Sequence, residues 1–392
     1  MKSHPLSETT PRSTGHESLR LSFAYVAILG MMGIQLPYWP VWLADRGMEA
    51  DQIGLLLGVF TWARLAAPWA GSLADRQGRP DRLAVALAGA TLACTAAFTF
   101  THGFLPLFLL SAVWGLAMAP IMPLVDGISV AAAAKGRLDY GRVRVWGSAA
   151  FVIVSMLGGH ALQGRSPSLV LTTLIAAAAA LLAATCWLPR VATPVVTVGA
   201  PAVSQLAMLR RPRMAAFLGA IACMQGSHAV LYGFGTQHWL AIGINESAIG
   251  GLWAWGVIVE VALFAIGNRL VVLASPAGLL VVAGLGGVIR WPLLATVESV
   301  PLLFAIQTLH ATTFAAMHLG AMNWIRDSID GPSVQRATSL YVAVGSGIAL
   351  GVGMPLAGVL FEHHAGGAYH AMAVSSGIGL LFALRLWRAR AG

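Results

Sequence analysis

Apolar stretches of about 20 residues recur along the whole chain, separated by short polar or Pro/Gly-rich breaks. Each is long enough to cross the roughly 30 Å hydrocarbon core of a bilayer as one α-helix. Only 10% of the 392 residues are charged, whereas a soluble domain carries about 25%. The pattern predicts an all-α membrane protein with about twelve spans. The predicted spans are 20–44, 51–72, 83–101, 104–130, 142–163, 167–189, 213–241, 247–267, 276–296, 299–325, 336–361 and 367–388.

The positive residues predict how these spans are oriented. If the N-terminus is cytoplasmic, all but four of the 24 Lys and Arg residues lie in or beside cytoplasmic segments. Because short cytoplasmic loops carry the excess of Lys and Arg in membrane proteins, we expect both termini in the cytoplasm. This placement accounts for the net charge of +9 without a nucleic-acid partner. The exceptions are Arg46 and Arg165 in predicted outside loops, and Arg64 and Arg290 within spans.

The two halves of the chain resemble each other. A shift of 196 residues, half the chain length, lays GMEADQIG at 47–54 on GINESAIG at 243–250. The same shift lays Arg64 on Glu260, so opposite charges occupy matching positions within spans. Two similar bundles around a midplane site suit transport by alternating access, because they can rock against each other. The predicted segments are a cytoplasmic tail at 1–19, a six-helix bundle at 20–189, a cytoplasmic linker at 190–212, a second six-helix bundle at 213–388 and a cytoplasmic tail at 389–392.

The most specific motif follows the second predicted span. GSLADRQGRPDRL at 71–83 resembles the loop signature of the major facilitator superfamily, G-x-L-x-D-R-x-G-R-x-x-x-L. The resemblance implies the major facilitator fold, with about 12 transmembrane helices in two pseudo-symmetric halves. Glycines permit a tight turn and close helix approach, and an Asp can bind an arginine or a helix N-terminus, so we expect a cytoplasmic gate between the halves. The expected gate residues are Gly71, Asp75, Arg76, Gly78 and Arg79.

Charged residues within the predicted spans are candidates for a functional site. A charge at the bilayer centre costs about 2.5–3.5 kcal/mol even on the lenient insertion scale, so such side chains usually face a cavity or a partner. His310 adds a group that titrates close to neutral pH. A structural pair between Arg64 and Glu260 that holds the halves together is an alternative interpretation. The candidates are Arg64, Asp126, Glu260 and Arg290.

A second resemblance concerns these charges. Asp126 together with LDYGRVRVWGSAAF at 138–151 is similar to lactose permease and related oligosaccharide–proton symporters, where an acidic residue pairs with an Arg of a G-R-x-R-x-aromatic-G motif. VIRW around Arg290 and QTLH around His310 resemble the ninth and tenth helices of that group. The resemblance implies that Asp126 and Arg144 line the substrate site. It also implies that the coupling network contains Glu260, Arg290 and His310, and we add Arg64 to that network.

The proton carrier is expected to differ from that of lactose permease. Gln307 and Thr313 stand where the tenth helix of that protein carries a Lys and a Glu. We expect Glu260 to be the carrier, with Asp126 as the second candidate. Burial disfavours a charged carboxylate and a nearby arginine favours it, so movement of Arg290 relative to Glu260 would change the proton affinity.

A closer resemblance is to the phenylpropionate permease family of the same superfamily. It implies a proton-coupled symporter that carries an aromatic monocarboxylate inward. A carboxylate could bind Arg144 or Arg290, and aromatic side chains could form an apolar pocket. The similar phrases are LPYWPVWL at 36–43, LDYGRVRVWGSAAFVI at 138–153, QGSHAVLYGF at 225–234, GLWAWGVIVEVALFAI at 251–266 and LHATTFAAMHLGAM at 309–322. The predicted substrate-binding residues are Asp126, Arg144, Trp146, Tyr232 and Trp253.

The sequence also bears on classes of function other than transport. The chain has no HExxH or GxSxG motif, which argues against a membrane-embedded enzyme. Its three cysteines have no metal-ligand spacing, and neither a metal nor a cofactor is expected beyond the proton gradient as energy source. We expect a monomer in the bacterial inner membrane. A sugar or nucleoside symporter, a proton-antiport exporter and a sensor without transport remain alternatives, and the direction of transport is open.

Overall fold

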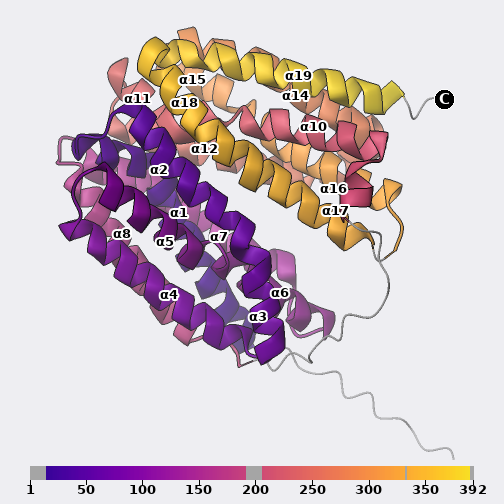
Figure 1. The fold of residues 1–392 in the computed structure, drawn as a ribbon, viewed down its shortest axis with the longest axis horizontal. Helices are drawn as coiled ribbons and strands as arrows, with labels where there is room; N and C mark the ends of the chain where they lie inside the picture. Colours follow the sequence, from indigo (N-terminus) through magenta and orange to yellow (C-terminus); the bar gives the residue numbers. More distant parts are fainter. Residues whose placement is uncertain (1–14, 191–204, 332, 389–392) are drawn as a thin grey trace, which may run out of the picture.

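The fold consists of helices joined by short turns. The computed structural model describes residues 15–190, 205–331 and 333–388, and none of these residues forms a strand. Figure 1 shows two helical bundles side by side, one from each half of the chain. The first half contains α1 (Gly15–Asp45), α2 (Ala50–Trp62), η1 (Ala63–Ala66), α3 (Ala67–Gln77), α4 (Pro80–Ala97), η2 (Phe98–Phe100), α5 (Phe104–Met118), α6 (Ile121–Ala134), α7 (Tyr140–Leu162) and α8 (Ser168–Cys186). The second half contains α9 (Gln205–Leu209), α10 (Pro212–Gly226), α11 (Ala229–Ala241), α12 (Glu246–Ala265), α13 (Gly267–Ala274), α14 (Pro276–Thr296), α15 (Val300–Gln307), η3 (Ala311–Ala316), α16 (Met317–Ser328), α17 (Ser333–Val342), η4 (Ala343–Ala349), α18 (Leu350–His364), η5 (Ala365–Gly367) and α19 (Ala368–Arg388).

The predicted number of spans is confirmed. Eleven helical segments of the described chain are long and apolar enough to cross a membrane, and the last of them, Ser333–Arg388, has 56 residues. At 1.5 Å per residue a helix of that length would measure about 84 Å, more than twice the hydrocarbon thickness. The turn at η5, where Ala365 has a φ of 45°, divides it into two spans. The described chain therefore contains twelve helical segments long enough to span a membrane.

The predicted tails and linker fall largely outside the described residues. Residues 1–14, 191–204 and 389–392 are among those not described. Within the described chain, α1 begins at Gly15 and not at residue 20, and the short helix α9 precedes α10.

The two halves contact each other through two matching helix pairs. The first, α2 with α18, and the second, α12 with α7, carry the largest contacts between the halves. The 196-residue shift lays α2 on α12 and α7 on α17–α18, so the second pair is the first with the halves exchanged. The internal repeat predicted from 47–54 and 243–250 thus has a structural counterpart.

Glycines permit close approach of the backbones at both crossings. A Cβ atom on Gly54 would lie 2.6 Å from the carbonyl oxygen of Met354, and one on Gly250 would lie 2.5 Å from that of Ser155. Gly159 of α7 lies equally tightly against the backbone of Glu246. Because real Cβ atoms do not approach so closely, the halves can meet here only where side chains are absent.

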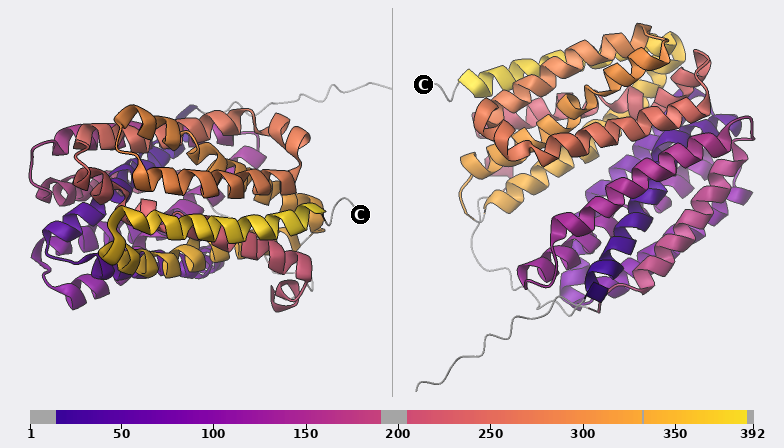
Figure 2. Two further views of the ribbon diagram at one scale, coloured as in Figure 1. Left: turned by 90° about the horizontal axis from the view of Figure 1, so that it is seen from above. Right: turned by 180° about the vertical axis from the view of Figure 1, so that it is seen from behind.

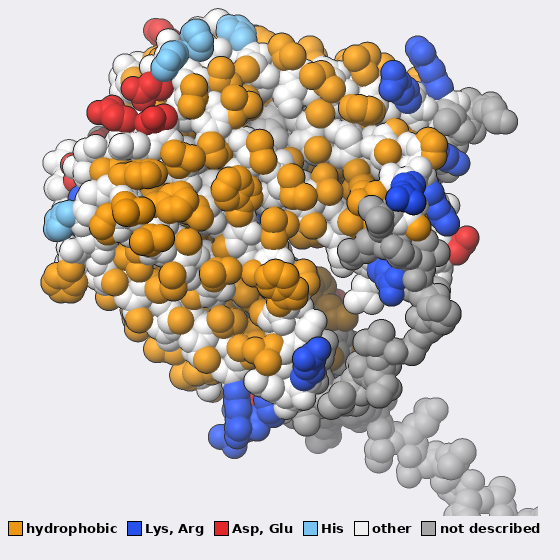
Figure 3. Space-filling view, in the orientation of Figure 1, with side chains coloured by type: hydrophobic (Ala, Val, Ile, Leu, Met, Phe, Trp, Pro, Cys, Tyr) orange, Lys and Arg blue, Asp and Glu red, His pale blue; other side chains and the backbone are white. Residues whose placement is uncertain are grey.

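The two ends of the molecule differ in charge and in shape. We call the end that carries Arg76, Lys135, Arg326 and Arg388 the basic end, and the opposite end, with Glu49, Glu246, Glu298 and Glu362, the acidic end. These two contacts, α2 with α18 and α12 with α7, which we call the glycine crossings, join the halves toward the acidic end. Figures 1 and 2 show the bundles leaning apart toward the basic end, and Figure 3 shows the surface hollowed between them there.

The predicted gate motif forms the turn between α3 and α4. Gly78 ends α3 with a φ of 62°, a conformation that favours glycine, and Pro80 begins α4. Arg79 donates two hydrogen bonds to Asp81, of 3.0 Å and 2.8 Å, and so binds a residue of its own half. A Cβ on Gly71 would have no neighbour within 4 Å, so the close helix approach expected there is absent from this conformation. Arg76 is exposed, and the side chain of Asp75 lies outside the described residues.

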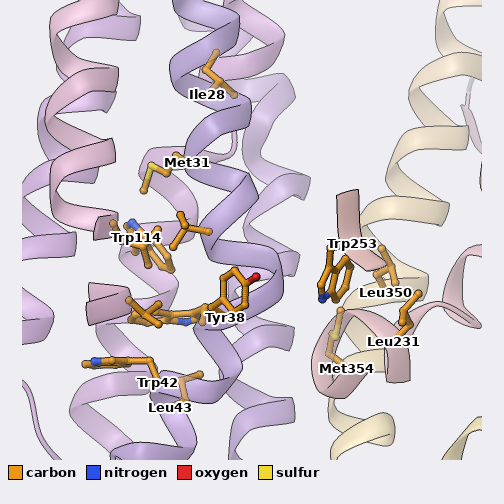
Figure 4. Close-up of a cluster of buried hydrophobic side chains, with 14 of the residues drawn as sticks. Ile28, Met31, Tyr38, Trp42, Leu43, Trp114, Leu231, Trp253, Leu350 and Met354 are labelled. Atoms are coloured by element: carbon orange, nitrogen blue, oxygen red, sulfur yellow. The ribbon is translucent and has the colours of Figure 1, made fainter. Parts of the chain in front are cut away.

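Aromatic side chains fill much of the core of the first half. The rings of Trp39 and Trp42 stack with centroids 4.5 Å apart, and Trp114 lies 5.1 Å from Trp39. Figure 4 shows this cluster opposite Trp253 and Met354 of the second half. The cluster keeps α1 and α5 rigidly packed beside the interface between the halves.

Candidate substrate and coupling site

A cavity of about 320 Å³ lies between the two halves. Its residues on α2 and α12 follow Gly54 and Gly250 along the chain, so the cavity lies on the basic-end side of the glycine crossings. The volume is at the lower end of the roughly 300–1,000 Å³ typical of small-molecule sites. Its aromatic lining residues are Trp39, Phe60, Phe151, Tyr232, Trp253 and Phe314. Its charged or titratable lining residues are Arg64, Arg144, Glu260, Arg290 and His310.

Arg290 is fully buried at the wall of this cavity. It is bound by two neutral side chains and by one histidine. Its Nη2 donates to Oε1 of Gln307 at 2.5 Å, and its Nη1 donates to Oγ1 of Thr313 at 2.8 Å. Nη1 also lies 3.1 Å from Nδ1 of His310. Among the described residues, no carboxylate forms an ion pair with Arg290. The cation is therefore held in place without direct neutralisation.

A π-helical segment, η3, orients the residues that bind Arg290. It separates α15 from α16 within one span and follows His310 directly. The wider turn of a π-helix shifts the side-chain register, and such segments are frequent at functional sites. Here Gln307, His310 and Thr313 all contact the same guanidinium.

Glu260 is connected to Arg290 through His310. Oε2 of Glu260 lies 3.6 Å from Nε2 of His310, whose other ring nitrogen faces Arg290. The carboxylate is 20% exposed and lines the cavity. At 3.6 Å the contact is too long for a hydrogen bond, but a small movement would make it one. Glu260 is thus accessible to the cavity and linked to a buried cation.

Two arginines of the first half face the cavity without a carboxylate partner. Arg64 has no hydrogen bond or ion pair within the part of the chain that the structure describes, and it lies in η1, a 3₁₀ turn within the second span. Arg144 of α7 places its guanidinium 5.3 Å from the ring centre of Tyr25 and likewise has no ion pair there. The predicted alternative, a structural Arg64–Glu260 pair, is not formed. Two cations are available to bind an anion.

The expected pair between Asp126 and Arg144 is also not formed. Oδ1 of Asp126 accepts hydrogen bonds from the hydroxyl groups of Tyr25, at 2.6 Å, and Tyr140, at 3.1 Å. Asp126 is not among the residues that line the cavity. Tyr25 lies between the two charges, because its hydroxyl binds Asp126 while its ring lies under Arg144.

The structure brings two of the three predicted aromatic residues to the cavity. Tyr232 and Trp253 line it, and Trp253 is fixed by a 2.9 Å hydrogen bond from Nε1 to Oγ1 of Thr236. Trp146 does not line it: its side chain is 58% exposed on the outer surface of α7. Two residues after Arg144 on a helix, a side chain points to a different face, so Arg144 and Trp146 cannot both face the cavity.

Sequence reasoning missed the roles of Gln307 and Thr313. We regarded both only as departures from lactose permease, whereas they bind Arg290. The available signal was their position three residues before and after His310, within an otherwise apolar span. Phe314, which lines the cavity beside them, carried no such signal.

Twelve helical segments of spanning length in two bundles, around a cavity lined by charged side chains, form the architecture of a membrane transporter. The chain belongs to the MFS_1-like family of the major facilitator superfamily, whose family profile matches residues 18–371. It is a multi-pass membrane transporter of small molecules, and its relatives are transporters and not enzymes.

The curated relatives include one of nearly full length. The chain is 34% identical over 360 residues to the "Probable 3-phenylpropionic acid transporter" of Escherichia coli (strain K12), covering 90% of this chain and 94% of that protein. It is 27% identical over 140 residues to the "Quinolone resistance protein NorA" of Staphylococcus aureus (strain MRSA252), covering 34% of this chain and 35% of that protein. The resemblance to the phenylpropionate permease family is confirmed.

Solved structures share the fold. The nucleoside transporter NupG superposes with a TM-score of 0.82 at 14% sequence identity, covering 95% of this chain and 98% of that one. A bacterial homologue of the lysosomal transporter Spinster gives a TM-score of 0.69, also at 14% identity, covering 96% of each chain. At this identity the likeness concerns the fold alone.

Proposed function

We propose that this protein takes up a small aromatic monocarboxylate, such as 3-phenylpropionate, together with a proton by alternating access. The observation that carries the proposal is a small cavity that combines unpaired arginines with six aromatic side chains. A carboxylate on a short chain beside a ring would satisfy both kinds of side chain. The relative named as a 3-phenylpropionic acid transporter supports the same substrate class.

The geometry suggests how the substrate would lie. Arg64 and Arg144 belong to the first half and would bind the carboxylate by charge-assisted hydrogen bonds. Tyr232, Trp253 and Phe314 belong to the second half and would pack against the ring. A bound substrate would therefore contact both halves, so its binding would favour their approach at the open end.

Coupling to protons follows from the charges of the cavity. Glu260 is the one carboxylate among the described residues that line the cavity. A substrate carboxylate that binds Arg144 would bring a second negative charge into the cavity beside Glu260. Because burial disfavours an uncompensated carboxylate, Glu260 would then take up a proton. One proton would move with each substrate anion, with no cofactor involved.

The orientation and assembly belong to the proposal as well. The clustering of Lys and Arg at the basic end supports its assignment to the cytoplasm, with both termini there. The moving units would be the bundles at 20–189 and 213–388, in the bacterial inner membrane. One chain contains a complete cavity, which supports a functional monomer.

The proposal is tested by uptake into proteoliposomes with an imposed inward proton gradient. We expect saturable uptake of 3-phenylpropionate and cinnamate, and no uptake of a disaccharide or a nucleoside, because the cavity of about 320 Å³ is lined by aromatic side chains and cations. Saturable uptake of only the sugar or only the nucleoside would contradict the proposed substrate. Proton-driven export of the aromatic acids would contradict the proposed direction.

The affinity for the carboxylate is expected to depend on Arg144. Charge-assisted hydrogen bonds contribute about 1.5–3 kcal/mol, so Arg144→Gln should raise the KM for 3-phenylpropionate by about 10- to 150-fold. Arg165→Gln, in the loop before α8, is the control and should leave the KM unchanged. An unchanged KM in Arg144→Gln would show that this arginine does not bind the carboxylate.

A further inference from the structure

Three titratable side chains lie in a row within the second half. His310 contacts α12 at Gly256, where a Cβ would lie 3.4 Å from its ring, and at Glu260, at 3.6 Å. His318, two turns later in the same span, contacts α12 one turn further along, with its ring centre 6.0 Å from that of Phe264. Glu260 lies between these two levels. Phe264 follows Glu260 by one helical turn, so both residues lie on the same face of α12, the face that His310 and His318 contact.

His318 extends the row toward the basic end. α16, which begins beside His318, runs to Arg326 at that end. Nδ1 of His318 lies 2.8 Å from the hydroxyl group of Tyr341 on α17. Tyr341 is 8% exposed and lies two residues before the π-helical segment η4. Neither His318 nor Tyr341 lines the cavity, so substrate binding does not account for this hydrogen bond.

We infer that His318 receives the proton that Glu260 releases and passes it through Tyr341 toward the basic end. The inference rests on the proposed function, because it assigns a release route to the proton that Glu260 carries. It gives the cytoplasmic half of α16 and α17 a role in coupling, in addition to the cavity itself. The route lies entirely within the second half, beside the substrate cavity and not through it.

The transfer is balanced if the imidazole begins neutral with its proton on Nδ1. In that tautomer Nδ1–H donates to the Tyr341 oxygen, and the lone pair of Nε2 is free to accept. The O–H bond of Glu260 breaks and an N–H bond forms on Nε2. The Nδ1 proton then moves to the Tyr341 oxygen, and the hydroxyl proton of Tyr341 passes to water at the basic end. One proton leaves Glu260 and one reaches the water.

The surroundings of His318 suit a transient and not a permanent charge. On α12 its ring lies beside Phe264, one turn after Glu260, and on α17 it contacts Tyr341. A protonated imidazole would be stabilised while Glu260 is ionised, that is, directly after the transfer. His310, on the other side of Glu260, is bound to Arg290, whose fixed positive charge disfavours a second cation there. The proton therefore leaves toward His318.

The test compares net uptake with exchange in proteoliposomes that hold the full-length chain. With 3-phenylpropionate as probe, His318→Gln should slow proton-driven uptake about tenfold, less than the 10²–10⁴ typical of a positioned acid or base because cavity water takes part of the protons. Exchange of labelled for unlabelled substrate at saturation needs no proton release and should stay within about twofold of wild type. Net uptake by the variant should also slow further in D₂O than wild-type uptake does.

Control variants separate the possible outcomes. Tyr341→Phe keeps the ring and removes the hydroxyl, so it should also slow net uptake and leave exchange unchanged. If His318→Gln does not fold, Tyr341→Phe tests the proposed route alone. His370→Gln, at an exposed position on α19, should change neither rate. Equal loss of uptake and exchange in both variants, or no loss of net uptake, would overturn the inference. Absence of any substrate-coupled proton movement in the wild type would instead overturn the proposed function.

Discussion

Replacing Glu260 with glutamine is expected to abolish accumulation of substrate against its gradient while leaving exchange intact. Glutamine keeps the shape of the side chain but cannot release a proton. With an inward gradient of two pH units, one proton per substrate permits about 100-fold accumulation, whereas the variant should equilibrate at a ratio of about one. Steady-state internal and external concentrations of labelled 3-phenylpropionate give this ratio directly.

The matched control for this prediction is Glu246→Gln in the same helix. Glu246 lies in the first turn of α12 at the acidic end, away from the cavity, so this variant should accumulate substrate as the wild type does. Because a monovalent anion and a proton together carry no net charge, a membrane potential alone should drive no accumulation by the wild type. Full accumulation by Glu260→Gln would show that Glu260 is not the proton carrier. Asp126 would then be the next candidate.

Bulk at the glycine crossings is expected to stop the transport cycle. The double variant Gly54→Val and Gly250→Val places side chains where even a Cβ would lie 2.6 Å and 2.5 Å from carbonyl oxygens of the opposite half. The acidic end should then fail to close, and uptake should fall to a few per cent of wild type or less, since close packing cannot absorb such volumes. Uptake rates and substrate binding to the purified protein measure both consequences, and binding should persist.

A reporter cysteine distinguishes this mechanism from misfolding. In a background where the three native cysteines are replaced by serine, Leu57→Cys would lie on the cavity wall next to the crossing. The double variant should make this cysteine reactive to a membrane-impermeant thiol reagent added from outside. Gly89→Val serves as control, because a Cβ there meets nothing within 4 Å. Unaltered reactivity together with lost binding would mean that the double variant is unfolded.

The sequence carries enough information for the fold because the bilayer limits the possibilities. A span must be a helix of about 20 apolar residues, so the hydropathy pattern alone predicts the twelve crossings. The internal repeat predicts two similar bundles, and in the structure the equivalent residues Gly54 and Gly250 both lie where the two halves pack against each other. The start of α1 at Gly15 was missed because polar residues extend a helix beyond the membrane without any hydropathic signal.

The sequence predicts which charged residues line the cavity, but it does not predict which side chains bind them. Arg64, Arg144, Glu260 and Arg290 line one cavity, as the cost of burying charge in a membrane suggests. Their partners depend on rotamers and on the local helix type, which sequence spacing does not give. Asp126 binds two tyrosines and not an arginine.

The helix face of Trp146 was predictable, and the register of the Arg290 network was not. Arg144 and Trp146 are two residues apart, and that spacing places them on different faces of a regular helix. The network around Arg290 depends instead on the π-helical segment η3, which no residue pattern in ATTFAA announces. Gln307 and Thr313 contact the guanidinium from either side of His310, where the regular helix gives way to the wider π-helix.

In the proposed pose the substrate reaches from one half to the other, so its length would affect transport. The cations Arg64 and Arg144 lie in one half and the ring-binding residues Tyr232 and Trp253 in the other. In the proposed pose, an aromatic acid with its carboxylate directly on the ring would span a shorter distance between these two sets. If such a molecule did not contact both bundles at once, it would bind without being transported. The two methylene groups of a phenylpropionate would then matter to translocation more than to binding.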